Sequence, residues 1–252
     1  MATQLAPVPF NPGVPMKREW GTALSALRRL LANGDDTEQV FKIMRALNGD
    51  VTQRNYRKLL TVPGGGAIAY KRVELAERLT DRAWIDSFAE GTVGAAYRNF
   101  LDSTGYSADG LVELSMGEFG DADAEHPYTW MGRRERDIHD LWHVLTGYQA
   151  DEHLGEACLV AFSYAQTGGL GWGFIALGAA LKSLRVTGRA DFLKAVTEGY
   201  RRGKQAKWLH GEDYEALMAE PLDAARRRLN IAEPVRYQIA QASLAAAGLK
   251  GI

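Results

Sequence analysis

Apolar residues recur along most of the chain at the three- and four-residue intervals of an amphipathic α-helix. A clear example follows the polar stretch Asp35-Asp36-Thr37-Glu38, whose residue types commonly begin helices. Gly49 then stands where a helix typically ends. The main apolar positions between these two signals are Val40, Phe41, Ile43, Met44 and Leu47. The pattern predicts a helix with one buried face and with both ends marked.

The same signals predict three further helices. Thr92 precedes an apolar face that ends before Gly105, Asp191 opens another helix, and Pro221 suits the first turn of a third. Alternating β-branched runs with Asn-Gly or Asp-Gly turns are missing from the sequence, and residues 61–66 are a predicted loop between helices. The sequence therefore predicts an all-α fold.

The predicted organisation is a short arm followed by one domain. Four of the eight prolines fall within the first twenty residues, so residues 1–19 are expected to form an irregular Pro-rich arm. Residues 20–252 are expected to form a single-domain multi-helix bundle. The formal net charge of -1 offers no global field for nucleic acid, so we expect no nucleic-acid partner. The one cysteine, Cys158, has no partner for a disulfide within the chain.

Residues 157–181 form a run without any charged side chain, which is long enough in principle to cross a membrane. Its middle is polar and contains the pair Gly168-Gly169. A glycine pair between two apolar stretches is more typical of two helices that meet at a joint. We therefore expect two buried helices here rather than one transmembrane span.

The densest group of chemically active side chains lies in residues 133–143. His139 and His143 are four residues apart, so a helix places them one turn apart on one stripe. Asp140 lies beside them on the polar side of the helix, facing away from the apolar residues. A separate apolar stripe predicts the packed face of this helix: Ile138, Leu141, Trp142 and Leu145. Two imidazoles one turn apart can both bind one cation at about 2.0 to 2.1 Å, and a nearby carboxylate can supply an oxygen.

These residues predict a metal site made of His139, Asp140, His143 and Glu156, the last being the most plausible ligand from a second helix. The alternative is that the histidines are ordinary solvated side chains, since such pairs are common on polar helix faces. Arg136 falls one turn before His139, where it suits a substrate carboxylate or phosphate. The competing interpretation is a solvated arginine paired with one of its acidic neighbours, Glu135 or Asp140.

The motif His139-Asp140-x-x-His143, followed by Gly147 and by Leu154-Gly155-Glu156, resembles the metal-site motif of the coenzyme Q protein four family of ubiquinone biosynthesis. Gly91-Thr92-Val93-Gly94, with Tyr97 and Phe100, is similar to a second family stretch. Glu220-Pro221-Leu222, with Arg226, Leu229 and Ile231, is similar to a third. The resemblance covers roughly residues 20 to 235 in the right order.

The sequence departs from the family pattern at two places. Twelve residues separate His143 from Glu156, one more than the family commonly has, so Asp151, Glu152 and His153 compete with Glu156 as the fourth ligand. Glu156 ranks first because it alone keeps the Leu-Gly-Glu context. The second departure is Glu90, which stands where the family tends to have proline and leaves the metal site unaffected.

The resemblance implies a role in making ubiquinone. The implied reaction removes the ring carboxyl of a polyprenyl hydroxybenzoate and installs a hydroxyl at that carbon, with Arg136 and Asp140 as our candidate catalytic residues. A site of two imidazoles and carboxylates suits a divalent ion such as Zn, Fe, Mn, Co or Mg. The implied partners are a polyprenylated hydroxybenzoate or other prenyl lipid and further ubiquinone biosynthesis proteins.

A prenyl tail needs an apolar shelter, and the charge-free helices after Glu156 are the candidates. Small residues recur every four positions as Ala161, Ala165, Gly169 and Gly173. Our predicted tail-lining residues are Phe162, Gly169, Gly173 and Leu177. The competing interpretation is that the small residues only let another helix pack closely. A basic cluster defined by Arg201, Arg202, Lys204 and Lys207 is a candidate contact for anionic headgroups or a solvated face.

Two other functional classes remain open at this stage. A non-catalytic scaffold that binds polyprenyl lipid would organise other biosynthetic enzymes and would need no open metal position. A metal-dependent phosphohydrolase would use the His-Asp pair to activate water, but only three histidines lie outside the motif to supply further ligands. We expect a cytoplasmic protein, with peripheral attachment to the inner face of a membrane and a homo-oligomeric state both left open.

Overall fold

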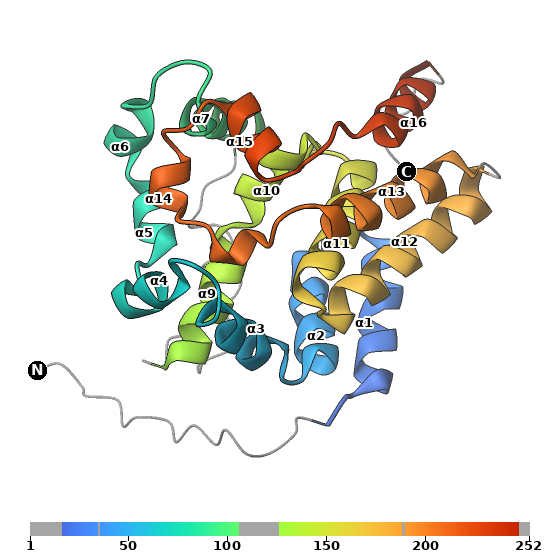
Figure 1. The fold of residues 1–252 in the computed structure, drawn as a ribbon. Helices are drawn as coiled ribbons and strands as arrows, with labels where there is room; N and C mark the ends of the chain where they lie inside the picture. Colours follow the sequence, from blue (N-terminus) through green and yellow to red (C-terminus); the bar gives the residue numbers. More distant parts are fainter. Residues whose placement is uncertain (1–16, 35, 106–125, 188–189, 247–252) are drawn as a thin grey trace, which may run out of the picture.

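The computed structural model describes residues 17–34, 36–105, 126–187 and 190–246, and the described parts contain helices and no strand (Figure 1). The only strand-like pairing described there is an isolated bridge between Thr92 and Pro221. This confirms the predicted all-α, single-domain fold. The helices are α1 (Trp20–Ala32), α2 (Thr37–Asn48), α3 (Val51–Leu59), α4 (Gly65–Lys71), α5 (Leu75–Thr80), α6 (Arg82–Asp86), α7 (Val93–Thr104), α9 (Pro127–Asp137), α10 (His139–Thr146), α11 (His153–Thr167), α12 (Leu170–Thr187), α13 (Asp191–Gln205), η1 (Leu209–Gly211), α14 (Tyr214–Leu217), α15 (Leu222–Arg228) and α16 (Val235–Ala246).

The four helices predicted from their end signals are present as α2, α7, α13 and α15. The hydroxyl of Thr92 accepts a hydrogen bond from the backbone N–H of Ala95, as an N-cap should, and Gly105 ends α7 with a φ of 69°. Residues 1–16 of the predicted arm, and Asp35, lie outside the described residues. The predicted loop over residues 61–66 is too long, because α4 already begins at Gly65.

The charge-free run forms two helices, α11 and α12, as predicted. Gly168 ends α11 in the left-handed region, with a φ of 71°, where glycine avoids the strain of a side chain. Over the described residues, no helix combines the length and apolar character needed to cross a membrane.

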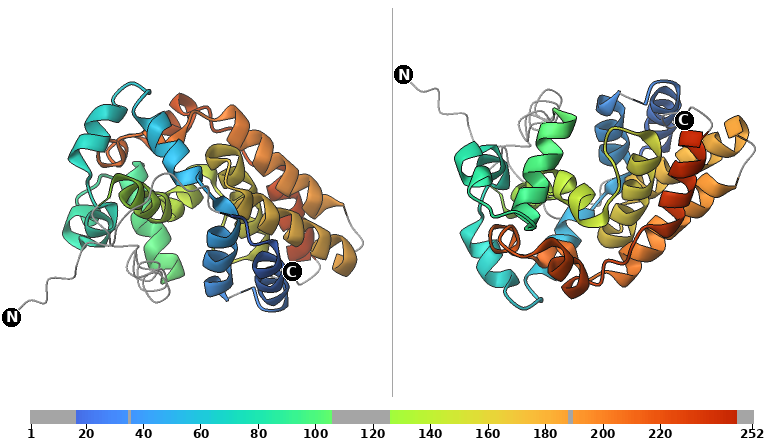
Figure 2. Two further views of the ribbon diagram at one scale, coloured as in Figure 1. Left: turned by 90° about the horizontal axis from the view of Figure 1, so that it is seen from below. Right: turned by 90° about the horizontal axis from the view of Figure 1, so that it is seen from above.

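Helix α11 forms the centre of the larger helical layer, where it packs against α12, α13 and α16 (Figures 1 and 2). Two glycines of α13 allow the close approach. A Cβ added at Gly199 would lie 2.5 Å from the carbonyl oxygen of Cys158, and one at Gly203 would lie 2.6 Å from that of Phe162. Since real atoms do not approach so closely, only glycine lets α13 lie against the backbone of α11.

Helix α10 lies between α11 on one side and α7 and α15 on the other (Figure 1). Its end is fixed by two arginines from distant parts of the chain. Arg226 donates to the carbonyl oxygens of Val144 and Leu145, both at 3.0 Å, and Arg202 donates to that of Thr146 at 2.8 Å. Guanidinium groups at the last carbonyls satisfy acceptors and complement the helix dipole. Two distant segments of the chain therefore anchor the end of the helix that carries the histidines.

Candidate metal centre

Three predicted ligands converge in the structure. His139 and His143 lie one turn apart on α10, and Glu156 lies in the first turn of α11. One ligand atom from each of the three lies within 4.8 Å of the other two, the only such group among the described residues. The Glu156 oxygens lie 3.2 Å from Nε2 of His143 and 3.7 Å from Nε2 of His139. Two imidazoles and a carboxylate at this spacing form a set that can hold one divalent cation.

The tautomer of His143 is fixed by its surroundings. Its Nδ1 lies 2.9 Å from the backbone carbonyl oxygen of Tyr148, which can only accept, so Nδ1 carries the hydrogen. Nε2 is buried and makes no hydrogen bond, although a Glu156 oxygen lies 3.2 Å away. A lone pair on neutral Nε2 would then face a carboxylate oxygen. Two facing acceptors need a cation between them, either a proton on Nε2 or a metal ion, so the residues present fit a metal.

The same proximity shifts the pKa values of the pair. Burial alone would raise the pKa of Glu156, but the adjacent His143 and His139 rings outweigh it and hold that pKa well below its usual range. Burial alone would lower the pKa of His143, but the Glu156 carboxylate outweighs it and raises that pKa. The site therefore favours a negative carboxylate beside a positive charge, which a bound metal would supply.

Aromatic rings cover both histidines. The Trp172 indole stacks on the His139 ring with centroids 5.9 Å apart and planes 7° apart. Phe100 stacks on His143 at 5.9 Å. The Trp172 ring is itself held, because its Nε1 donates to Glu135 at 3.1 Å. Such outer contacts orient ligand rings and limit their motion.

A fully buried histidine, His210, lies next to Glu135. His210 Nε2 lies 3.6 Å from the second carboxylate oxygen of Glu135, and its ring packs edge-on against Trp142. The sequence analysis did not assign Glu135, Trp172, Tyr148 or His210 to the site's supporting residues. The sequence shows only that Glu135 lies four residues before His139, whereas the contacts of the other three depend on long-range packing.

Asp140 lies among the ligands but differs from its predicted setting. The sequence placed it on the polar side of the helix, whereas the side chain is buried with 5% exposed. Burial raises the pKa of Asp140, although the charges of His139 and His143 act to lower it. It does not belong to the group whose ligand atoms lie within 4.8 Å of one another, so its role as a ligand stays a prediction.

The other candidate ligands before Glu156 lie outside the convergent group. Glu152 accepts a hydrogen bond from the Tyr237 hydroxyl and another from Gln241. The side chain of His153 lies against Gly34. The convergent group includes Glu156 and leaves out Asp151, Glu152 and His153.

Arg136 is engaged by its neighbour in the chain. Both its Nε and one terminal nitrogen lie within 2.8 Å of one carboxylate oxygen, Oδ1, of the buried Asp137. The other oxygen of Asp137 accepts a hydrogen bond from the backbone N–H of Ala76. The sequence suggested Glu135 or Asp140 as the competing partners, and the structure shows Asp137 in contact with the guanidinium. Helix α9 ends at Asp137 and α10 begins at His139, so Arg136 and His139 lie on two different helices. Their spacing in the sequence therefore does not fix how the two side chains are oriented to each other.

The predicted tail-lining residues lie in different surroundings. Phe162 is fully buried and packs edge-on against Trp142, while Leu177 is 56% exposed. A Cβ added at Gly173 would lie 3.2 Å from the Tyr164 ring, and one at Gly169 would lie 3.0 Å from Asn48. Close packing accounts for these two glycines, and a tail groove stays a prediction.

The basic cluster is smaller than the sequence suggested. Arg202 is buried with 4% exposed and donates to backbone carbonyl oxygens, so it cannot meet a headgroup. Arg201, Lys204 and Lys207 are exposed.

Comparison with known proteins identifies the family. The sequence profile described as "Coenzyme Q (ubiquinone) biosynthesis protein Coq4" matches residues 14–235. The chain belongs to the Coq4 family. This family takes part in ubiquinone biosynthesis, and the resemblance noted in the motifs is thereby confirmed.

Similar proteins carry the same family name. A Danio rerio protein named ubiquinone biosynthesis protein COQ4 homolog, mitochondrial, is 30% identical over 68% of this chain and 61% of its own length. A Bos taurus protein of the same name is 30% identical over 76% of this chain and 71% of its own length. The chain thus spans about six tenths of the Danio rerio protein. A crystal structure from Nostoc punctiforme superposes with a TM-score of 0.62, covering 86% of this chain and 100% of the other, and at 19% identity it supports the fold alone.

Proposed function

We propose that this Coq4-family protein catalyses a metal-dependent step of ubiquinone biosynthesis, the oxidative decarboxylation and hydroxylation of the ring carboxyl carbon of a polyprenyl hydroxybenzoate. The observation that carries the proposal is the convergence of His139, His143 and Glu156 on one point in a family of this pathway. A divalent metal there would act as a Lewis acid toward the ring oxygen and, if redox-active, would also support oxygen chemistry.

The protein's own residues supply position and polarity. The Tyr148 carbonyl fixes the His143 ring so that Nε2 faces the site, and Trp172 covers His139. Asp140 adds a buried carboxylate next to the ligands, where a raised pKa lets it hold a proton more readily than an exposed aspartate. Arg136 remains the candidate for the substrate carboxylate, which would have to compete with Asp137 for the guanidinium.

The proposal includes a lipid partner and a membrane nearby. Large apolar side chains remain exposed on two neighbouring helices, Trp20 and Leu24 on α1 and Leu177 and Leu181 on α12. Exposed apolar residues on two helices that pack together support contact with prenyl lipid or a bilayer surface. We place the protein in the cytoplasm, peripherally attached to the inner face of a membrane and associated with other ubiquinone biosynthesis proteins.

The deciding experiment incubates metal-analysed protein with a short-chain prenyl hydroxybenzoate, with and without oxygen. Loss of the ring carboxyl and gain of a hydroxyl, dependent on both metal and oxygen, would support the proposal. Protein that binds the lipid and a metal but leaves the substrate unchanged would contradict it and favour the non-catalytic scaffold. The His139→Ala variant serves as the control for metal carried at other sites.

A further inference from the structure

His210 is a fully buried side chain whose chemistry is not explained by the packing around it. It lies in the short η1 helix, where its ring stacks on Trp208, with centroids 5.3 Å apart, and lies perpendicular to Trp142, with centroids 5.2 Å apart. Neither ring nitrogen has a hydrogen-bond partner among the described residues. An imidazole carries at least one N–H, and a buried donor without an acceptor is unfavourable. An apolar side chain could fill this space without that cost, so the histidine needs another explanation.

The Glu135 carboxylate is the group that can stabilise an N–H of His210. Within the described ranges it is the only carboxylate within 4.0 Å of a His210 nitrogen, and its Oε2 lies 3.6 Å from Nε2. This separation is too long for a hydrogen bond, but a hydrogen on Nε2 would place positive charge beside the carboxylate. Only 12% of the Glu135 side chain is exposed, so solvent screens the attraction weakly. The pairing therefore favours a His210 ring that carries a hydrogen on Nε2.

The other oxygen of Glu135 connects this pair to the metal centre. Oε1 accepts a hydrogen bond from Trp172 Nε1 at 3.1 Å, and the Trp172 indole stacks on His139 with planes 7° apart. One carboxylate of α9 thus interacts with both η1 and the first turn of α12. None of the contacts that the structure gives His210 involves a proposed metal ligand, so its influence on the ligands must pass through a neighbour.

We propose that His210 is a positioning residue of the metal centre. Its Nε2–H holds one oxygen of Glu135, so that the other oxygen stays directed at the Trp172 indole and keeps that ring over His139. The inference rests on the proposed metal centre, but it depends on neither the substrate nor the reaction. Loss of a residue that orients a ligand directly lowers metal affinity about 10- to 100-fold. Because His210 acts through two other side chains, we expect a smaller effect.

Two substitutions separate the N–H of His210 from its ring. His210→Phe keeps an aromatic ring against Trp208 and Trp142 but removes the donor. His210→Gln loses the ring but keeps an N–H that can face Glu135. A role in packing alone predicts that phenylalanine preserves the parent behaviour better than glutamine, and the positioning role predicts the reverse. Circular dichroism checks that the helices persist in both variants.

The first measurement is the NMR resonance of the Trp172 indole N–H in the metal-free, full-length protein. The resonance is assigned by its loss in Trp172→Phe, and its position depends on the hydrogen bond to Glu135. We expect His210→Phe to shift this resonance and to speed the exchange of its hydrogen with solvent. His210→Gln should leave both close to the parent values.

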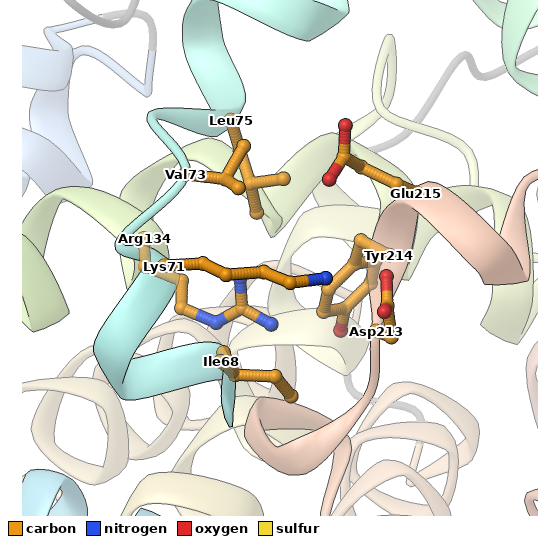
Figure 3. A pocket seen from close by; sticks show the side chains of 8 residues that line it. All are labelled: Ile68, Lys71, Val73, Leu75, Arg134, Asp213, Tyr214 and Glu215. Carbon is orange, nitrogen blue, oxygen red and sulfur yellow. The ribbon is translucent and has the colours of Figure 1, made fainter. Parts of the chain in front are cut away.

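Tyr214→Phe is the matched control, because it disturbs a different neighbour of His210. The Tyr214 hydroxyl accepts a hydrogen bond from Trp142 Nε1 at 2.7 Å, and the Arg134 guanidinium lies 5.2 Å from the centre of the Tyr214 ring (Figure 3). Phenylalanine removes the hydroxyl and keeps the ring. The change affects the Trp142 side of His210 and leaves the carboxylate pairing untouched, so the Trp172 resonance should stay at its parent position.

The second measurement is a double-mutant cycle for Zn²⁺ affinity, with His210→Phe, Trp172→Phe and the double variant titrated by calorimetry. We expect His210→Phe to weaken Zn²⁺ binding roughly threefold in the parent and to cause no further loss in the Trp172→Phe background, because its effect passes through the indole. Equal losses in the two backgrounds would overturn this route.

The remaining outcomes also decide the proposal. An unmoved Trp172 resonance in His210→Phe, an equal shift in Tyr214→Phe, or better preservation by phenylalanine than by glutamine would overturn the positioning role. Unchanged Zn²⁺ affinity of His210→Phe would overturn it as well, whatever reaction the protein catalyses. If both measurements give the expected results while the prenyl substrate is left unchanged, the proposed reaction is wrong and the role of His210 is supported.

Discussion

Replacing Glu156 by glutamine tests the metal centre most directly. Glutamine keeps the size of the side chain and one carbonyl oxygen but removes the negative charge. In the structure that charge faces both histidines, at 3.2 Å from Nε2 of His143 and 3.7 Å from Nε2 of His139. Loss of partners that merely orient a ligand already lowers metal affinity about 10- to 100-fold. Because Glu156 itself is the proposed ligand, we expect a loss of at least about 100-fold.

The stability of the metal-free protein should change far less. The Glu156 side chain is 39% exposed, so solvent screens its attraction to His143 and limits the loss to about 1 kcal/mol or less. For a chain of this size that loss would lower the melting temperature by about 2 to 4 °C. A large drop in affinity with a small drop in melting temperature would therefore separate metal binding from folding.

Glu152→Gln is the matched control, since it makes the same chemical change four residues earlier. Glu152 bonds to Tyr237 and Gln241 instead of the histidines, so its variant should bind metal as the parent does. The assay is calorimetric titration with Zn²⁺, supported by the absorption spectrum of the Co²⁺ form. Equal metal affinity of parent and Glu156 variant, or a comparable loss in the Glu152 variant, would refute the assignment.

Three further substitutions probe the surroundings of the site. Trp172→Phe keeps a ring over His139 but removes the N–H that donates to Glu135, so metal affinity should fall up to about tenfold by calorimetry, and an unchanged affinity would exclude a positioning role. Arg136→Lys keeps the positive charge but loses the planar guanidinium group with its paired donors. Turnover in the decarboxylation assay should therefore fall strongly, while the metal content stays near that of the parent. Unaltered turnover would indicate that Arg136 has only a structural role. Gly155→Ala would place a Cβ 2.0 Å from a backbone carbonyl oxygen, so it should lower the free energy of unfolding by about 1 to 3 kcal/mol. In the control Gly132→Ala the nearest atom lies 3.9 Å from the added Cβ, so the free energy of unfolding should not fall. Equal melting temperatures of the two variants would contradict the packing argument.

The sequence could predict the helices because their signals are local. Thr92 and Gly105 mark the two ends of α7 through bonds and dihedral angles formed within a few residues. The spacing of His139 and His143 likewise predicts their proximity, since one helical turn determines it. Glu156 could be assigned only by its context, because its distance from the histidines depends on how α11 packs against α10.

Burial and partner choice could not be predicted in this way. Asp140 lies beside the histidines as the helical spacing requires, but α7 and α11 cover α10 on opposite sides and bury the carboxylate. The spacing of Arg136 and His139 does not fix their relative direction, because α9 ends at Asp137 and α10 begins at His139. The charged residues next to Arg202 in the sequence suggested that it lies on the surface. In the structure it is buried and donates hydrogen bonds to the carbonyl oxygens of Thr146 and Ala232.

One glycine sets how the connecting loop approaches the first turn of α11. The loop starts at Gly147, which ends α10 with a φ of 77°. It then returns to α11, where the carbonyl of Gln149 lies against Gly155. Any side chain at Gly155 would collide with that carbonyl, so the glycine fixes how closely the loop approaches the first turn of α11. The next residue is Glu156, which lies in the first turn of α11 with an oxygen 3.2 Å from Nε2 of His143. The Leu-Gly-Glu sequence therefore places a residue without a side chain at the close contact and the proposed ligand directly after it.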